Sequence, residues 1–399
     1  MQVGIVGKPN AGKSTFFSAA TLTIVPIANY PFTTTKPNKG ISYLRTKCIC
    51  KDLGLTDNPR NSRCIDGERY IPVELIDCPG LVPGASSGKG LGNQFLDDLR
   101  KADALIHVVD ASGGTDSEGK QTEAGEHNPL IDVGWLEKEL EAWMLAILMK
   151  DWEKVTRTAA TLDEIEGTMA ERLSGLGLKR FQIEDGVKKT GLKGKPATWT
   201  REDLARLIGV LRREGKPMLL AANKIDLPSS KENLPKLMQS GNMTVPVSAE
   251  AELALRRAAE KSLISYKPGD PDFAISPSAS LRPQQKEALE MIRKQVLSVE
   301  GATGVQESIN DAFFKLLNMI VVYPVEDPEQ KTDHSGNVLP DAILVRKGST
   351  LKDLALKIHT ELGENLLYGV NARNGMRLGE GHILNDGDIV SIVSASSRK

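Results

Sequence analysis

A glycine-rich segment near the N-terminus constrains the fold more than any other stretch of the sequence. Residues 7–14 read G-x-x-x-x-G-K-S and follow an apolar run at residues 2–6, which is typical of a buried strand. Residues 14–20 then predict a helix, whose first N–H groups and dipole attract phosphate. Gly7 and Gly12 let the backbone approach the phosphates, because neither carries a Cβ. The segment therefore predicts a phosphate-binding loop for a nucleoside triphosphate.

The side chains of this loop have specific expected roles. Lys13 is expected to reach the β- and γ-phosphates, and the Ser14 hydroxyl is expected to bind Mg²⁺. The other expected nucleotide contacts of the loop are Asn10, Ala11, Gly12 and Thr15. The alternative is a glycine-rich turn that binds nothing, and the complete motif between a strand and a helix argues against it.

A second polar motif, D-x-x-G at residues 77–80, directly follows an apolar run at residues 70–76. Open α/β sheets place their ligands at such carboxyl ends of strands. We expect Asp77 to hold Mg²⁺, directly or through water, and the Gly80 N–H to sense the γ-phosphate. The glycine-dense run at residues 81–92 predicts a loop that orders with one ligand and loosens with another, with a plain flexible loop as the alternative.

A third motif, N-K-x-D, predicts which base is bound. Guanine presents N1–H and N2–H₂ as adjacent donors, and the carboxylate of Asp226 accepts both, whereas adenine has an acceptor at N1. Lys224 is expected to cover the base plane, and Asn223 to tie this loop to the phosphate-binding loop. The expected set is completed by Ser248, Ala249 and Glu250, with the Ala249 N–H facing guanine O6.

Apolar runs that alternate with helical patterns, and that carry polar motifs at their carboxyl ends, predict a doubly wound α/β sheet. We expect a P-loop GTPase domain over residues 1–270, with a helical insertion at about 115–215. A helical linker at 271–317 is expected to pack with that insertion. A strand–strand–helix–strand–strand order over 318–399 predicts a compact β-grasp module.

The composition is that of an ordinary globular protein, with 40% hydrophobic and 26% charged residues. The formal net charge of −1 gives no overall attraction to nucleic acid or membrane, so an RNA contact requires a local patch. No signal peptide and no apolar stretch of about 18 residues is evident. These features predict a cytoplasmic protein with no membrane partner.

The four cysteines are too few for a disulfide scaffold and indicate a reducing compartment. Cys48 and Cys50 form a C-x-C pair, and Cys64 follows, which is compatible with a thiolate metal site. The spacing lacks a C-x-x-C pair and a fourth ligand is not evident. We therefore favour free thiols on a hairpin.

Five stretches together resemble the motif series of Obg-family GTPases of the translation-factor class: GKPNAGKST, YPFTTTKPN, DCPGLVPGASSGKGLG, NKID and SAE. The insertion and the C-terminal module resemble archaeal members related to YchF, in which the tail is a TGS domain. The resemblance covers nearly the whole chain. It implies that Thr34, with Phe32 and Thr33 before it, is the switch threonine that closes on Mg²⁺ and the γ-phosphate. It also implies a link to ribosomes or structured RNA.

Two departures shape the expected activity. YchF proteins have a divergent base-recognition motif and favour ATP, whereas NKID is intact here, so we expect GTP and GDP as ligands.

Leu81 stands where Ras-like proteins carry the glutamine that orients water. Resembling proteins use another element, in some cases K⁺ held partly by an asparagine at the position of Asn10. We therefore expect slow GTP hydrolysis to GDP and phosphate, with Lys13, Thr34 and Gly80 as catalytic groups, stimulated by K⁺ or by a partner. The alternatives are a nucleotide-gated binding module with negligible hydrolysis and an ATP-preferring enzyme.

Overall fold

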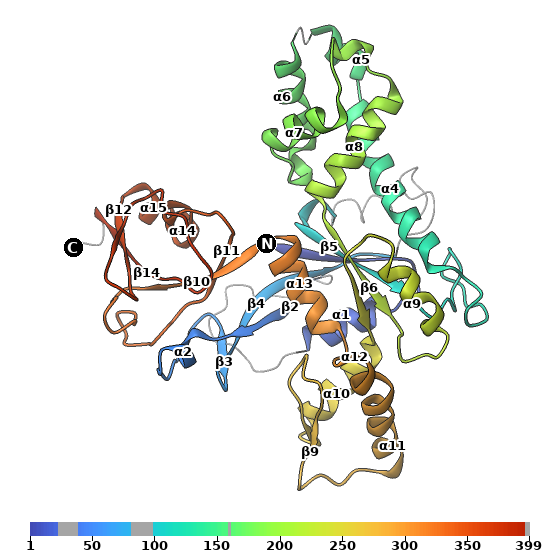
Figure 1. The fold of residues 1–399 in the computed structure, drawn as a ribbon, viewed down its shortest axis with the longest axis vertical. Coiled ribbons are helices and arrows are strands. Elements are labelled where there is room, and N and C mark those ends of the chain that lie inside the picture. The colour runs from blue at the N-terminus through green and yellow to red at the C-terminus, as the bar shows by residue number, and fades with distance from the viewer. Residues whose placement is uncertain (23–38, 81–98, 159–160, 396–399) are drawn as a thin grey trace. The chain divides into compact units, whose positions relative to one another are not determined.

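The computed structural model describes residues 1–22, 39–80, 99–158 and 161–395 (Figure 1). The described residues divide into two compact units. The first holds residues 1–22, 39–40, 74–80, 99–158 and 161–308, and the second holds residues 41–73 and 309–395.

The first unit is built on a parallel sheet with the strand order β4-β1-β5-β6-β7. The strands are β1 (Gln2–Val6), β4 (Glu68–Asp77), β5 (Ala104–Asp110), β6 (Met218–Asn223) and β7 (Thr244–Val247). Residues of β5 and β6 are buried throughout, which explains their continuous apolar sequences. The strand order reverses at β1, which has β4 on one side and β5 on the other. The crevice at such a reversal is where open α/β sheets bind ligands, and the predicted doubly wound fold is confirmed.

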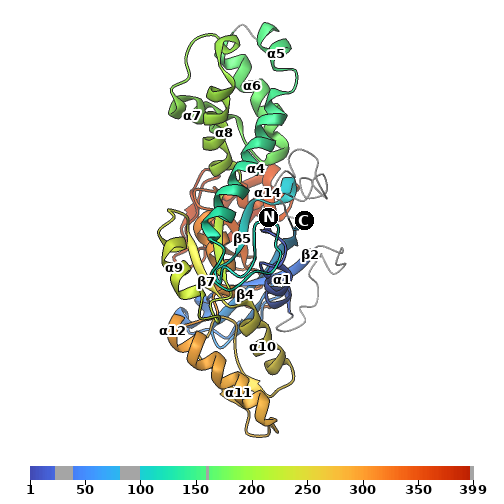
Figure 2. The ribbon, with the colours of Figure 1, turned by 90° about the vertical axis from the view of Figure 1, so that its right-hand side faces the viewer.

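A helical insertion connects β5 to β6. It consists of α4 (Pro129–Met149), α5 (Trp152–Thr158), α6 (Leu162–Leu173), α7 (Arg180–Thr190) and α8 (Arg201–Gly215). Figure 2 shows α4 leading from the sheet to the other helices of the insertion. The inner faces of these helices, including Leu140, Ile183 and Leu207, share one apolar core with residues of β1, β4, β5 and β6. Helix α4 contacts β5, and α8 packs on α4.

Two further helices flank the carboxyl ends of β6 and β7, namely α9 (Ser230–Met238) and α10 (Ala249–Glu260). The chain continues through β8 (Ile264–Ser265), β9 (Ala274–Ile275), α11 (Pro283–Ile292), a π-helical turn (Arg293–Leu297), α12 (Ser298–Glu300) and α13 (Val305–Asp311). Leu289 and Leu297 share a core with Leu255 of α10 and with Phe273. The core residues of this segment therefore face α10 and the β8–β9 hairpin, not the helices of the insertion with which we expected it to pack.

The second unit contains the C-terminal module and a hairpin from the N-terminal part of the chain. The module is a five-stranded sheet in the order β11-β10-β14-β12-β13, with β10 and β14 parallel. Its elements are β10 (Met319–Val325), β11 (Ile343–Arg346), α14 (Leu351–Ile358), α15 (Thr360–Glu364), β12 (Leu366–Asn371), β13 (Arg377–Leu378) and β14 (Ile389–Ser394). Leu351 and Leu354 of α14 pack on Val322 and Val390 of the central strands. This is the β-grasp arrangement expected from the element order.

The hairpin in this unit is formed by β3 (Arg63–Ile65) and the first half of β4, with Cys64 opposite Arg69. It follows β2 (Lys39–Lys47) and the short helix α2 (Ile49–Asp52). The loop between α2 and β3 is joined to the C-terminal module by backbone hydrogen bonds, such as Arg60 N–H to Pro340 O at 2.7 Å. Among the described residues, no helix combines the length and the apolar character that are needed to cross a membrane.

The insertion core offers a direct stability test. Leu207 has no exposed surface, so Leu207→Ala leaves a cavity and is expected to lower the free energy of unfolding by about 2–5 kcal/mol. All four tryptophans of the chain lie in the insertion, at positions 135, 143, 152 and 199. Denaturation followed by tryptophan fluorescence therefore reports on this region. The control Leu162→Ala, at a side chain that is 37% exposed, is expected to change stability by less than about 0.5 kcal/mol; equal effects of the two variants would contradict the assigned core.

Candidate nucleotide site

The glycine-rich loop leads from β1 into α1 (Lys13–Thr21) with the backbone that the motif requires. Gly7, Asn10 and Gly12 all have positive φ, at 143°, 60° and 96°. A Cβ on Gly7 would clash with the Val108 carbonyl oxygen, and one on Gly12 would clash with the side-chain amide of Asn223. The first two positions of α1 are Lys13, which is buried, and Ser14, which is exposed. The loop thus turns tightly and leaves its N–H groups at the start of a helix, as phosphate binding requires.

Lys13, Asp77 and Gly80 lie together at the carboxyl ends of β1 and β4. A Cβ on Gly80 would stand 3.3 Å from Lys13 Nζ, which itself donates to the Lys8 carbonyl oxygen at 2.8 Å. Burial lowers the pKa of Lys13 to about 8, although the Asp77 carboxylate acts in the opposite direction. Burial also raises the pKa of Asp77, and the charge of Lys13 opposes this. The two groups therefore form a desolvated pair of opposite charge at the mouth of the loop.

Asp77 carries an unsatisfied oxygen. Within the described residues, its buried Oδ1 atom has no hydrogen-bond partner. An orphaned carboxylate oxygen in a polar crevice is costly unless a ligand satisfies it. Carboxylate and hydroxyl oxygens are the ligands that Mg²⁺ prefers in proteins, so Asp77, with Ser14 at the start of α1, fits the group that we expected there.

Asn223, at the end of β6, joins three loops. Its side-chain nitrogen donates to the Ala11 carbonyl oxygen at 2.9 Å, and its side-chain oxygen accepts from the Ala249 N–H at 3.0 Å. Ala249 begins α10, directly after Ser248. The predicted tie between the base-recognition and phosphate-binding loops is present in the structure. The side-chain oxygen of Asn223 accepts the hydrogen bond of the Ala249 N–H, however, whereas we had expected this N–H to face guanine O6.

The carboxylate of Asp226 is oriented by the loop after β7. Ser248 Oγ donates to Asp226 Oδ1 at 2.7 Å. Asp226 also borders a hollow of about 230 Å³ beside α9, lined in part by Leu227 and Lys231. Glu250 is exposed in the first turn of α10, so its expected contribution is not seen among the described hydrogen bonds of the site.

The sequence predicted a role for Lys224 but not its pairing with Asp110. Lys224 has a φ of 69°, and its Nζ contacts Asp110 Oδ2 at 2.7 Å. Asp110, the last residue of β5, has no exposed surface and accepts from the hydroxyls of Ser112 and Thr115 at 2.5 and 2.8 Å. Burial acts to raise the pKa of Asp110, but these hydrogen bonds and Lys224 outweigh it and lower the pKa. The carboxylate thus stays charged and fixes the lysine stem beside the base-recognition loop.

The segment after β5 also wraps the phosphate-binding loop, which the sequence did not reveal. Lys8 is buried, and its Nζ contacts the Thr115 carbonyl oxygen at 2.7 Å and Asp132 Oδ2 at 2.8 Å. Asn10 Nδ2 donates to the Gly119 carbonyl oxygen at 2.9 Å. A carboxylate at the end of a buried strand, as Asp110 is, is the one signal in the sequence that could have pointed to this segment. The phosphate-binding loop is consequently held by hydrogen bonds and an ion pair from two parts of the chain, Asn223 and residues 115–132.

Phe32, Thr33, Thr34 and Leu81 lie outside the described residues, as does the glycine-dense run that follows Gly80. His107 lies within β5 and is 1% exposed. Burial, with the charges of Lys13 and Lys8, lowers the pKa of His107 to about 3. This histidine is therefore a neutral core residue.

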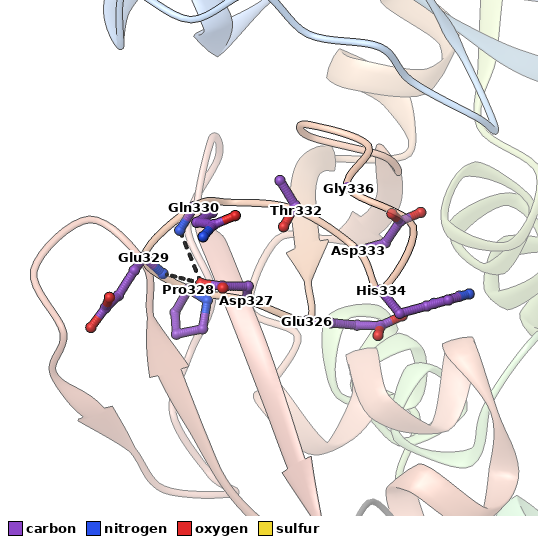
Figure 3. Close-up of a pocket in the computed structure, with 9 residues that line it drawn as sticks. All are labelled: Glu326, Asp327, Pro328, Glu329, Gln330, Thr332, Asp333, His334 and Gly336. Carbon is purple, nitrogen blue, oxygen red and sulfur yellow. Dashed lines mark hydrogen bonds and ion pairs between the residues drawn. The ribbon is translucent and has the colours of Figure 1, made fainter.

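Another hollow, in the C-terminal module, is a poor phosphate site. Figure 3 shows it lined by Glu326, Asp327, Glu329 and Asp333, with His334 at its edge. His334 Nδ1 lies 2.9 Å from Glu326 Oε1, and this hydrogen bond raises the pKa of the imidazole. The carboxylates that line the hollow repel phosphate, so the crevice of the first unit stays the candidate nucleotide site.

Three known families match successive parts of the chain. Residues 2–134 match a family described as 50S ribosome-binding GTPase. Residues 221–327 match the G4 motif-containing domain of Obg-like GTPases described as YGR210-like, and residues 335–394 match the TGS domain. A GTP-binding protein of Methanocaldococcus jannaschii is 49% identical over 396 residues, which cover 99% of each chain. This chain belongs to the Obg-like GTPases related to YchF.

Two more relatives place this Obg-like GTPase within the family. The crystal structure of a GTP-binding protein from Pyrococcus horikoshii OT3 has a TM-score of 0.78 and 40% identity, and the match covers 99% of this chain and 100% of that one. The ribosome-binding ATPase YchF of Bacillus subtilis is 31% identical over 281 residues, which are 66% of this chain and 70% of that protein. The resemblance inferred from the motifs is confirmed, as is the P-loop GTPase fold with a C-terminal TGS domain.

The pKa of Lys13 predicts how nucleotide binding depends on pH. Phosphate binds the protonated amine, so affinity for GDP is full below pH 8 and is expected to fall above it, by up to about tenfold per pH unit, as free Lys13 loses its proton. Fluorescence titration with a labelled GDP, repeated at pH values over about three units, from about 6.5 to about 9.5, measures this change in affinity. Lys13→Arg keeps its charge throughout and is expected to flatten the profile. A profile that falls equally in both proteins would contradict the role of Lys13.

Proposed function

We propose that this Obg-like GTPase binds GTP with Mg²⁺ in the crevice at the end of β1 and hydrolyses it slowly to GDP and phosphate. The observation that carries the proposal is the position of Asn223, which bonds the phosphate-binding loop and the loop after β7 at once. A ligand with a base at one end and phosphates at the other fits such an arrangement. Family membership supports the same chemistry.

Each predicted group then has a defined role. Lys13 is assigned to neutralise charge on the β- and γ-phosphates. Gly80, where a Cβ would stand close to Lys13 Nζ, is assigned to sense the γ-phosphate through its N–H. Ser14 and Asp77, together with Thr34, would hold the Mg²⁺, which would supply positive charge next to the phosphates. Asn10 donates its amide nitrogen to Gly119, so its amide oxygen is the atom assigned to K⁺.

Guanine selection is assigned to Asp226. Its carboxylate accepts from N1–H and N2–H₂ of guanine, and Ser248 holds it in place. Because adenine would leave this partly buried acceptor without its two donors, the discrimination against ATP is expected to reach about 10⁴. The intact N-K-x-D motif supports GTP, although the Bacillus subtilis relative is named an ATPase.

The partner is proposed from the family names. One matching family is described as ribosome-binding, and the YchF relative is named ribosome-binding. We propose that nucleotide state, reported by the loops around Thr34 and after Gly80, controls association with ribosomes or structured RNA. Co-sedimentation with ribosomes is expected to be several-fold stronger with a non-hydrolysable GTP analogue than with GDP. Equal sedimentation in both states would contradict the switch role.

Base specificity is tested by Asp226→Asn. Asparagine offers one donor and one acceptor, which match the O2 and N1–H of xanthine, so preference is expected to move from GTP to XTP by about 10²-fold or more. Competition binding of GTP, XTP and ATP measures this. Preference of the unaltered protein for ATP would overturn the guanine assignment, and retention of GTP preference in the variant would overturn the role of Asp226.

Hydrolysis is tested by single-turnover measurement of phosphate release in K⁺ and in Na⁺. The rate is expected to be higher in K⁺ and to lose this difference in Asn10→Ala, because the variant lacks the amide oxygen. Equal rates in the two salts would remove the role of K⁺. No release above the uncatalysed rate, with ribosomes present, would favour a binding module whose nucleotide only gates association.

A further inference from the structure

Four metal-ligating side chains meet in the second unit, away from the nucleotide site in the sequence. Cys48, Cys50, Asp57 and Cys64 each offer one ligand atom, and these atoms lie within 4.8 Å of one another. Cys50 Sγ and Cys64 Sγ are 3.7 Å apart, and Cys48 Sγ lies 3.2 Å from Asp57 Oδ2. A tetrahedral zinc ion with Zn–S bonds of about 2.3 Å holds two sulfurs about 3.8 Å apart. The cluster therefore has the dimensions of a tetrahedral zinc site.

Backbone structure brings these side chains together. Cys48 directly precedes α2, and its N–H donates to the Gly67 carbonyl oxygen at 2.8 Å, in the turn between β3 and β4. Cys50 lies within α2, and Cys64 lies in β3. Cys48 and Cys50 are buried. A helix start, a loop and a strand thus contribute ligands to one enclosed point, as closed structural metal sites require.

A buried arginine completes the electrostatics of the cluster. Arg69 has no exposed surface, and its Nη2 lies 3.1 Å from Asp57 Oδ2, while its Nη1 donates to Ser62 Oγ at 3.0 Å. Three thiolates, one carboxylate and a divalent cation sum to a charge of about −2. The guanidinium offsets part of this charge and orients the carboxylate, which is the role of an outer partner in metal sites.

We propose that Cys48, Cys50, Cys64 and Asp57 form a structural zinc site. Thiolates select zinc over magnesium and calcium, and a full set of four protein ligands leaves no open position for catalysis. The sequence favoured free thiols because no fourth ligand was evident near the C-x-C pair. Asp57 supplies that ligand from the loop between α2 and β3. A single aspartate in a loop has no characteristic sequence spacing from the cysteines, so the sequence did not identify it.

The site would stabilise the surface on which the C-terminal module rests. The loop that follows Asp57 is bonded to that module: Asn58 N–H donates to the Val338 carbonyl oxygen at 3.2 Å, and Asn61 Oδ1 accepts from the Ala342 N–H at 2.9 Å. Zinc would cross-link α2, this loop and β3, and so hold the loop in the conformation that makes these bonds.

Metal analysis of the full-length chain tests the proposal. We expect one zinc per chain by mass spectrometry after purification under reducing conditions without chelator. After removal of zinc, Co²⁺ is expected to give thiolate charge-transfer and intense tetrahedral d–d bands at one equivalent. Thiol titration of the unfolded chain should find all four cysteines reduced. A reduced chain that binds less than one zinc and gives only weak octahedral Co²⁺ bands would overturn the proposal, as would a Cys50–Cys64 disulfide in the isolated protein.

Matched variants locate the metal. Cys50→Ser and Cys64→Ser are expected to lose bound zinc, whereas Cys78→Ser removes the one cysteine outside the cluster and is expected to keep it. Circular dichroism shows whether each variant is folded. Loss of zinc in Cys78→Ser alone would overturn the assignment. The Co²⁺ spectrum of the unaltered chain stands as evidence even where a serine variant fails to fold.

The fourth ligand is tested by Asp57→Cys. The number of thiolates would rise from three to four, so the Co²⁺ charge-transfer band is expected to grow by about a third. Asp57→Ala is the control, and its band is expected to stay near the three-thiolate intensity. Identical spectra for Asp57→Cys and the unaltered protein would remove Asp57 from the ligand set.

Discussion

The nucleotide site depends on a single buried amide. Asn223 ends a central parallel strand, donates to the loop after β1 and accepts from the first turn of α10. Both bonds lie in a site that water does not reach, where an unpaired polar group costs about 1–3 kcal/mol. Gly12 is required beside it, because any side chain there would meet the amide. Two loops that are more than two hundred residues apart in the sequence are thereby held in one geometry.

The sequence predicted the site wherever a motif encodes a local conformation. The phosphate-binding loop, the D-x-x-G turn and the N-K-x-D loop each follow an apolar strand, and parallel strands bring their carboxyl ends to one edge. Contacts made by common residue types could not be predicted in this way. Lys8 pairs with Asp132, and Lys224 with Asp110, across more than a hundred residues. Such pairs are set by tertiary packing: the two lysines stand in motifs, but no pattern marks the carboxylates with which they pair.

The same limit applies to the cysteines and to the linker helices. A C-x-C pair indicates thiolate chemistry, but the carboxylate of Asp57 reaches the cluster only because a hairpin folds back on α2. The amphipathic helix α11 carries an apolar face whose partner the sequence does not name, and in the structure that face packs with α10 and Phe273. Periodicity therefore showed which residues are buried and left open what buries them.

The central claim is that Asn223 couples base recognition to phosphate binding. Isothermal titration of GDP into the unaltered protein and into Asn223→Ala tests it most directly, with circular dichroism to confirm folding. The account predicts a loss of GDP affinity of at least about tenfold, because both loops lose a buried hydrogen bond, each worth about 1 kcal/mol. It also predicts weaker discrimination between GDP and ADP. Unchanged affinity and unchanged discrimination in a folded variant would contradict the account.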